Sequence, residues 1–333
     1  MTGVGPAPAH VPQTYAGRVH PAPLPEALTA LDRTLVMGVV NVTPDSFSDG
    51  GRWFEPDAAV EHGLALLDQG ADLLDVGGES TRPGAVRVDP ETERARVLPV
   101  IRELARAGAL VSVDTTRAGV AADAVAAGAR IVNDVSGGLA DPEILRVVAD
   151  AGVVYVVMHW RGHADVMDEL AGYQDVVADV RRELAARLDA ALAAGVGPEQ
   201  LVVDPGLGFA KPGSDNWPLL ARLDVLQELG RPVLVGASRK RFLGHLLAGP
   251  DGPAPPEARD AATAAVTALV AAAGAWCVRV HEVAGSADAV RVAARWRGAG
   301  GRVTHAEHPD PSGGEHRSAT EDLTGTRAGG DGG

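Results

Sequence analysis

A repeated alternation of two kinds of segment constrains the fold of this chain more than any other feature of its sequence. Short apolar runs rich in β-branched residues alternate with longer runs rich in alanine and leucine. The short runs have the length and composition of buried strands, and the longer runs have those of helices. Because strands that alternate with helices form parallel sheets, the pattern predicts a series of βαβ units.

The predicted elements follow directly from this alternation. The predicted strands are Leu35–Val40, Leu73–Val76, Leu110–Val113, Arg130–Asn133, Val153–Met158, Leu201–Val203, Val233–Val235 and Trp276–Val280. The predicted helices are Asp57–Gln69, Glu91–Arg106, Gly119–Ala127, Pro142–Asp150, Tyr173–Ala194, Asn216–Leu229, Arg259–Ala273 and Ser286–Trp296. Glycines placed to end helices in the left-handed conformation follow most of them: Gly70, Gly108, Gly128, Gly152, Gly195, Gly230 and Gly274.

Roughly eight strand–helix units predict the α/β class and a closed (β/α)8 TIM barrel. A doubly wound open sheet is the runner-up, but the turn after the first strand, NVTPDSF, lacks the glycine-rich GxGxxG pattern. We therefore expect a single barrel domain at residues 25–298. Residues 1–24 are predicted to be a flexible extension and residues 299–333 a disordered tail, because both lack periodic apolar residues.

Composition limits the classes of function. Acidic residues outnumber basic residues 44 to 30 and give a net charge of -14, which argues against nucleic acid and anionic membranes as partners. A single cysteine, Cys277, excludes a disulfide framework and a thiolate zinc site, and its apolar surroundings predict a buried thiol. We expect no signal peptide and no membrane span, and hence a cytoplasmic enzyme.

Polar residues stand where almost every predicted strand ends. In a TIM barrel these carboxyl ends form the active-site rim. Any single one of these residues could be a helix cap, but their convergence on one rim favours a binding site. The strand-end residues are Asn41, Gly77–Arg82, Asp114–Thr115, Asn133–Asp134, Met158–His159, Asp204–Pro205, Ser238–Lys240, Arg279 and His281.

The side chains at this rim suggest a flat, anionic ligand. Asp114 and Asp204 end apolar strands, so both carboxylates need hydrogen-bond donors, and with Asn133 they suit a heterocycle that carries N–H groups. Arg279 and His281 alternate on one strand and form a plausible cradle for phosphate oxygens. Without zinc-type spacing, a metal here would be a hard, oxygen-ligated ion such as magnesium, held mostly by phosphate and water.

The motifs at these positions resemble those of the dihydropteroate synthase family, in that family's order over residues 33–297. The matching motifs are NVTPDSFSDGG (41–51), DVGGESTRPGA (75–85), SVDTT (112–116), NDVSGG (133–138), MHWRG (158–162), DPGLGFAK (204–211), GASRKRFLG (236–244) and RVHEV (279–283).

The resemblance implies a transferase of folate biosynthesis. Such an enzyme joins 6-hydroxymethyl-7,8-dihydropterin diphosphate to p-aminobenzoate and releases 7,8-dihydropteroate and diphosphate. By the same resemblance, the pterin would contact Asp114, Asn133, Met158, Asp204 and Lys240.

The resemblance also implies roles for the residues around the two other groups. The diphosphate would contact Asn41, Arg279 and His281, with Asn41 also a ligand of Mg2+. The p-aminobenzoate pocket, where sulfonamides would bind too, would be lined by Phe47, Thr81, Arg82, Pro83, Phe209 and Ser238.

Catalysis would then depend on charge at the pterin methylene carbon. Magnesium, Lys240, Arg279 and His281 would neutralise the leaving diphosphate, and Asp49 would stabilise the cation that its departure creates. Loops at 41–52 and 77–86 would close over the site and exclude water. The family resemblance further implies a homodimer formed through the later helices.

Two points stay open at the level of sequence: the activity and the role of Arg241. A pterin-binding methyltransferase and a non-catalytic paralogue are the alternative functions, although the intact first loop and the SRK segment favour the synthase. Arg241 either meets the carboxylate of p-aminobenzoate or faces solvent from its helix.

Overall fold

The computed structural model describes residues 14–15, 18–19, 21, 24–43, 56–79, 87–163 and 169–303. Within them, an eight-stranded parallel sheet has the strand order β8-β7-β6-β5-β4-β3-β10-β9. Its strands are β3 (Leu35–Asn41), β4 (Leu73–Gly77), β5 (Val111–Asp114), β6 (Ile131–Asp134), β7 (Val154–Met158), β8 (Leu201–Asp204), β9 (Leu234–Val235) and β10 (Cys277–Val280).

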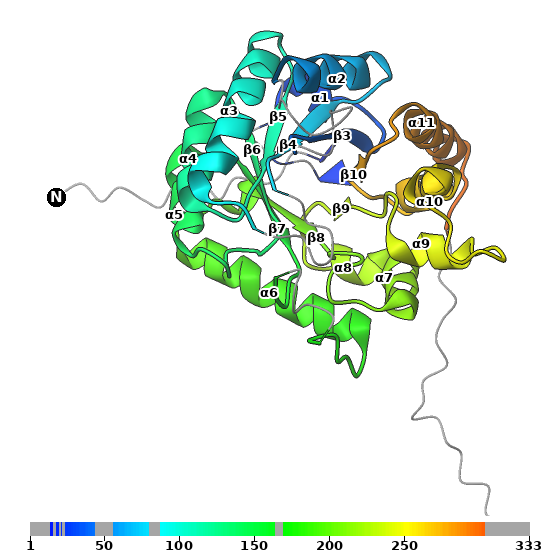
Figure 1. Ribbon diagram of the computed structural model, residues 1–333. Helices are drawn as coiled ribbons and strands as arrows, with labels where there is room; N and C mark the ends of the chain where they lie inside the picture. Colours follow the sequence, from blue (N-terminus) through cyan, green and yellow to red (C-terminus); the bar gives the residue numbers. More distant parts are fainter. Residues whose placement is uncertain are drawn as a thin grey trace, which may run out of the picture. The chain divides into compact units, whose positions relative to one another are not determined.

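The two edge strands of this sheet meet and close it into a barrel. Val203 of β8 forms a parallel bridge with Val233, and the Val203 amide donates to the Pro232 carbonyl at 2.9 Å. The strands form a ring with the helices around them (Figure 1). The predicted (β/α)8 barrel is confirmed, and the doubly wound open sheet is wrong because its edges would stay unpaired.

Helices connect successive strands and cover the outside of the barrel. The long helices are α2 (Pro56–Asp68), α3 (Pro90–Arg106), α4 (Ala118–Ala127), α5 (Glu143–Ala151), α6 (Val176–Ala193), α10 (Asp260–Ala272) and α11 (Ala284–Gly298). Shorter helices are α1 (Glu26–Thr29), α7 (Asn216–Ala221), α8 (Leu223–Gln227) and α9 (Arg241–Leu246), with 3-10 turns at η1 (Pro198–Gln200), η2 (Gly213–Asp215) and η3 (Pro256–Arg259). Each predicted helix-ending glycine has a positive φ, from 63° at Gly152 to 121° at Gly128.

One predicted helix is broken. The region 216–229 forms α7 and α8 because Arg222, between them, has φ −117° and ψ 47°, outside the helical region. Inside the expected flexible extension, β1 (Thr14–Tyr15) pairs antiparallel with β2 (Arg18–Val19), and no pattern in the sequence predicts this pair. The other predicted boundaries agree to within a few residues, and the C-terminal tail from residue 304 onward lies outside the described residues.

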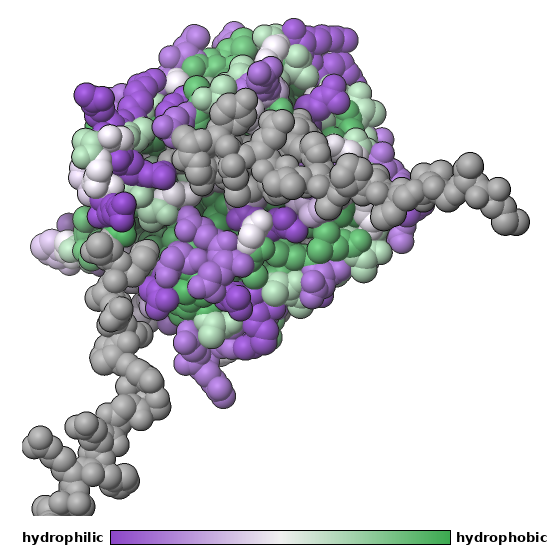
Figure 2. Space-filling model, turned by 180° about the vertical axis from the view of Figure 1, so that it is seen from behind, coloured by the Kyte–Doolittle hydropathy of each residue, from purple (hydrophilic) through white to green (hydrophobic). Residues whose placement is uncertain are grey.

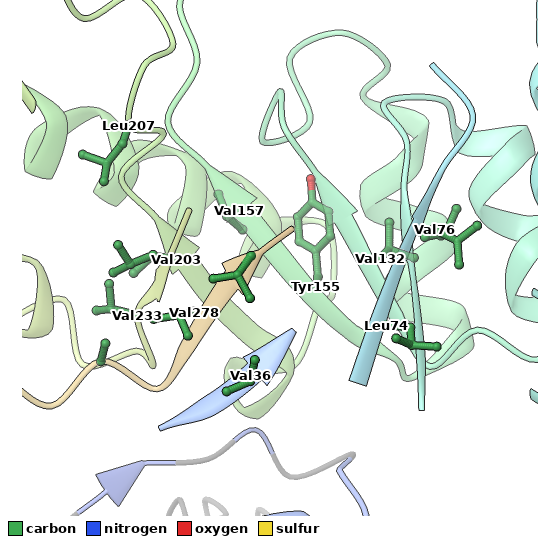
Figure 3. Close-up of a cluster of buried hydrophobic side chains, with 14 of the residues drawn as sticks. Val36, Leu74, Val76, Val132, Tyr155, Val157, Val203, Leu207, Val233 and Val278 are labelled. Atoms are coloured by element: carbon green, nitrogen blue, oxygen red, sulfur yellow. The ribbon is translucent and has the colours of Figure 1, made fainter. Parts of the chain in front are cut away.

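Two apolar layers hold the barrel. Side chains that point inward fill its interior, among them Leu35, Met37, Ile131 and the predicted buried thiol of Cys277. Alternate side chains point outward and pack against the helices, and Figure 3 shows part of this second layer around Tyr155. Burial of apolar surface stabilises the fold by about 25 cal/mol per Å2. The packed strands therefore hold the polar side chains at their carboxyl ends in fixed positions.

The surface outside these layers is mixed. Hydrophilic residues are spread over much of the face in Figure 2, with hydrophobic residues between them. In the described part of the chain, no helix combines the length and the apolar character that crossing a membrane requires.

Candidate active site

Acidic and amide side chains from neighbouring strands meet at the carboxyl end of the barrel. Asp75 lies on β4, Asp114 ends β5 and Asn133 lies on β6, where it pairs in register with Asp114. Asn133 Nδ2 donates to Asp75 Oδ2 at 2.8 Å. From β10, Arg279 Nη1 donates to the Oδ2 atoms of both Asp75 and Asp114 at 3.1 Å. These four side chains form one connected polar floor.

Asp75 is a site residue that the sequence analysis does not single out. Its signal is nevertheless in the sequence, because it is a carboxylate in the middle of the apolar strand LLDVG. Side chains alternate along a strand, so Asp75 shares the inward side with Leu73, which lies in the barrel interior. A charged residue on the inward side of an apolar strand needs a partner, and here it finds Arg279 and Asn133.

Two acceptor atoms of this floor have no hydrogen-bond partner among the described residues. They are Asp75 Oδ1 and Asn133 Oδ1, and both are buried. Buried polar atoms without partners are rare, because each loses its hydration without compensation. The floor therefore presents acceptors that suit a ligand with N–H donors.

The charges on the floor are shifted by burial and by each other. Burial, reinforced by the nearby Asp75 charge, raises the pKa of Asp114 to about 7. Burial disfavours the Arg279 cation, but the charges of Asp75, Asp114 and Asp204 outweigh it and raise the pKa of that guanidinium. The guanidinium therefore stays charged and holds together carboxylates that would otherwise repel each other.

The predicted acid Asp204 ends β8 and is buried, with 2% of its surface exposed. Its Oδ1 accepts from the Gly206 amide at 2.7 Å, and burial raises its pKa. A Cβ at Gly236 would lie within ordinary contact distance of Asp204 Oδ2 and the Arg279 guanidinium. Asp204 therefore lies at the same carboxyl end of the barrel as the polar floor, and we call this end the mouth of the site.

Lys240 and Phe209 form a wall beside this floor. Lys240 Nζ lies 4.1 Å from the centre of the Phe209 ring, a cation–π contact. Burial, with a smaller contribution from the Arg279 charge, lowers the pKa of Lys240 to about 7. Phe209 packs with Met158 and Val135 in a small apolar cluster, so the predicted residue Met158 also lies at the site.

A strained residue sets the direction of Lys240. Arg239 has a φ of 57°, a left-handed conformation that non-glycine residues rarely adopt. Its guanidinium holds Asp260 through two hydrogen bonds of 2.7 and 2.8 Å, and Arg259 donates to its carbonyl at 2.7 Å. These bonds hold the turn between Ser238 and Lys240, and strain of this kind often accompanies functional sites.

Ser238 and His281 lie together on the same rim. The Ser238 hydroxyl is 3.0 Å from His281 Nδ1 and accepts from the His281 amide at 3.1 Å. The family resemblance implies different ligands for these two residues, p-aminobenzoate for Ser238 and diphosphate for His281, whereas in the structure they are hydrogen-bonded to each other. Arg279, predicted beside His281 as a phosphate ligand, instead has its Nη1 bonded to the floor carboxylates.

Asn41 ends β3 opposite Gly77 and is partly exposed at the mouth. Its amide oxygen is a hard donor of the kind magnesium accepts. No group of three or more His, Cys, Asp or Glu side chains in the described residues has the arrangement of a metal site. Among the described residues, the donor at Asn41 therefore fits a magnesium ion that would take most of its other ligands from phosphate and water.

Part of the predicted site falls outside the described residues. These positions are Phe47, Asp49, Thr81, Arg82 and Pro83. Arg241 is described, and it is exposed in the first turn of α9, consistent with the solvent-facing interpretation.

Comparison with known proteins identifies the family of this site. The pattern of the family described as "Pterin binding enzyme" matches residues 37–281. A dihydropteroate synthase of Mycobacterium leprae is 58% identical over 270 residues, which cover 80% of this chain and 95% of the relative. The chain belongs to the dihydropteroate synthase family.

Solved structures of this family share its fold. The dihydropteroate synthase of Xanthomonas albilineans with 4-aminobenzoic acid is 49% identical, with a TM-score of 0.73 over 82% of this chain and 95% of that one. A structure of the enzyme from the same organism with 7,8-dihydropteroate is 46% identical, with a TM-score of 0.71 and the same coverage of both chains. The dihydropteroate synthase interpretation is confirmed, and neither the methyltransferase nor the non-catalytic paralogue is favoured.

Proposed function

We propose that this dihydropteroate synthase joins 6-hydroxymethyl-7,8-dihydropterin diphosphate to p-aminobenzoate. One observation carries the proposal for the site. Buried acceptors on Asp75, Asn133 and Asp204 lie around one mouth with the partly buried Asp114, and two of the buried oxygens have no partner among the described residues. The amino and ring N–H groups of a pterin supply the donors that such a floor needs.

The pterin orientation follows from the donors and acceptors of the floor. Asp114, Asn133 and Asp204 accept hydrogen bonds from the amino and ring N–H groups. Lys240 supplies the donor for the ring carbonyl, because its ammonium lies beside the acids and above the Phe209 ring. Met158 packs against the ring face, in line with its place in the apolar cluster with Phe209.

The phosphate end of the substrate extends toward Asn41 and His281. Both residues lie at strand ends on the rim, and Ser238 orients the His281 ring through Nδ1. Magnesium, when bound, supplies positive charge that stabilises the departing diphosphate, with Asn41 as its protein ligand. Arg279 assists through its charge, while its Nη1 hydrogen bonds keep the pterin floor assembled.

The second substrate enters from the wall side. Phe209 and Ser238 line its pocket, and the roles proposed for Phe47, Thr81, Arg82 and Pro83 rest on their motifs, since these positions lie outside the described residues. The diphosphate departs first and leaves a cation at the pterin methylene carbon. The aniline nitrogen then attacks this carbon and releases its proton to solvent. Asp49 is the group that stabilises positive charge at this carbon. Exclusion of water protects the carbon from hydrolysis.

Diphosphate release tests this function. The purified protein with both substrates and magnesium is expected to release one diphosphate for each 7,8-dihydropteroate formed. Asp114→Ala leaves ligand donors unpaired and is expected to lower pterin affinity about a hundredfold. Asp288→Ala, an exposed acid on α11, serves as the matched control. A protein that binds the pterin but forms no dihydropteroate would contradict the proposal.

A second copy of the chain is the proposed partner. Leu269 on α10 and Val292 and Trp296 on α11 are exposed apolar side chains on two helices that pack together, at 64%, 65% and 42% exposure. Their burial against another copy would stabilise a homodimer. Sedimentation should show a dimer, and Leu269→Lys should weaken it. A wild-type monomer at micromolar concentration would contradict this assembly.

A further inference from the structure

A buried lysine, Lys211, lies behind the wall of the site. Only 4% of its surface is exposed. Its Nζ donates to the carbonyls of Phe209 at 2.9 Å and Gly206 at 3.0 Å, and lies 2.9 Å from His159 Nδ1. An ammonium has three N–H donors and no acceptor, and here it meets three acceptors. The cation therefore organises the loop that carries it.

His159 continues this chain of hydrogen bonds. Its ring is buried, with Nε2 2.9 Å from Glu183 Oε2. Because Nδ1 accepts from the Lys211 ammonium, the ring proton lies on Nε2 and is donated to Glu183. Burial and the Lys211 charge lower the pKa of His159 to about 4, consistent with a neutral ring.

Glu183 links the chain to the loop between β7 and α6. Arg161 donates to both Glu183 oxygens, at 2.6 and 3.0 Å. The same guanidinium donates to the Gly172 carbonyl at 2.7 Å and lies 3.9 Å above the Tyr173 ring. Two loops of the mouth are therefore joined through side chains that do not belong to the polar floor.

The loop held by Lys211 is tightly turned. Gly206, Gly208 and Ala210 have φ values of 64°, 75° and 48°. A Cβ at Gly206 would come within 2.3 Å of the His159 carbonyl, so this turn is pressed against the end of β7. Phe209 lies in the middle of the turn with its ring under Lys240. Its position therefore depends on the carbonyl bonds to Lys211.

We propose that Lys211, His159 and Glu183 are positioning residues that fix Phe209 as the wall for p-aminobenzoate. They act on the second substrate through the loop backbone and do not touch the reacting atoms. This inference rests on the proposed function, because Phe209 matters only if p-aminobenzoate binds beside it.

Steady-state kinetics of the full-length protein separate this role from simple folding support. Lys211→Met is expected to raise the KM for p-aminobenzoate about tenfold, while pterin affinity stays within about threefold of wild type. His159→Leu should act in the same direction. His159→Gln keeps one acceptor for Lys211 and one donor for Glu183, and should restore most of the wild-type KM.

A matched pair on α6 tests the third residue. Glu183→Gln weakens the link to His159 and Arg161, and is expected to raise the KM for p-aminobenzoate about threefold. Asp189→Asn removes an exposed carboxylate from the same helix and should change nothing. This pair and the His159 pair decide the question if Lys211→Met fails to fold.

The possible failures are distinguishable. A wild-type protein that forms no dihydropteroate overturns the proposed function. An active wild type whose His159→Leu and Glu183→Gln variants keep an unchanged KM for p-aminobenzoate overturns the positioning role. Equal KM values for His159→Leu and His159→Gln overturn it too, because the hydrogen bonds would then be irrelevant.

Discussion

Lys240 and Lys211 lie in two regions that border the same loop, Asp204–Lys211. Their pKa values are lowered alike, but their hydrogen bonding differs. Burial lowers the pKa of both ammonium groups to about 7. In the region behind the loop, Lys211 meets three acceptors. In the mouth, Lys240 contacts the Phe209 ring and has no hydrogen-bond acceptor among the described residues.

The two regions differ in how many of their buried donors and acceptors have a hydrogen-bond partner. Similar pKa shifts do not separate a support from a ligand site, because desolvation acts on both lysines alike. Saturated donors indicate a rigid support, whereas unmatched donors and acceptors indicate a place that a ligand completes. Lys240 and the free oxygens of Asp75 and Asn133 belong to the second kind.

The largest expected effect concerns Lys240. Lys240→Met should lower kcat/KM about a hundredfold to a thousandfold, because it removes a donor that has no acceptor among the described residues and is proposed to bond the ligand. The folded state should keep most of its stability, since no hydrogen bond to the described residues is lost. Kinetics and urea unfolding of Lys240→Met beside Lys211→Met provide the measurement. If Lys240→Met keeps its activity but loses stability, then Lys240 supports the fold and does not bind the ligand.

The next effect concerns the charge that holds the floor together. Arg279→Met leaves the buried Asp75 and partly buried Asp114 carboxylates without their cation and should cost about 3 kcal/mol of unfolding free energy. Arg239→Met breaks a more exposed pair with Asp260 and should cost about 1 kcal/mol. Urea unfolding compares the two, and similar losses would show that the floor is not a buried ionic unit.

The third effect tests the support region by pH. His159 has a pKa of about 4 in the folded protein and about 6.5 when unfolded, so the unfolded state binds more protons between these values. Stability should therefore fall by about 3 kcal/mol as the pH drops from 6.5 to 4. Glu183, whose pKa is lowered by its bond to His159, adds a loss of the same sign below its unfolded value.

The control for this pH effect is His159→Gln, which has no titratable ring. Its unfolding free energy should depend less steeply on pH across the same window, whatever its stability at pH 7. If the unfolding free energies of the wild type and of His159→Gln change in parallel with pH, the pKa of His159 is the same in the folded and the unfolded state, and the prediction is wrong.

The smallest effect lies outside both regions. Tyr155 Oη donates to Asp134 Oδ2 at 2.7 Å, and this carboxylate also accepts from Ser136 and from the Gly138 amide (Figure 3 shows the tyrosine). Tyr155→Phe should cost about 1 kcal/mol of stability, because three of the donors remain. Kinetic constants should stay unchanged, and a raised KM would show that the mouth depends on this outer network.

The sequence by itself determined the order of the elements, the closed barrel and most of the strand-end residues of the site. These features depend on local patterns: apolar runs of strand length, glycines with positive φ at helix ends, and polar residues where strands stop. Asp114, Asn133 and Asp204 could be found this way because each stands at the end of an apolar run.

Only the tertiary structure decided which of these residues act together. Arg279 reaches Asp75 across 204 positions because β10 lies next to β3, which in turn lies next to β4. The same holds for Lys211 and His159, which stand in separate motifs and meet because β7 and β8 are neighbours. Hydrogen bonds depend on distance in space, and barrel closure sets those distances.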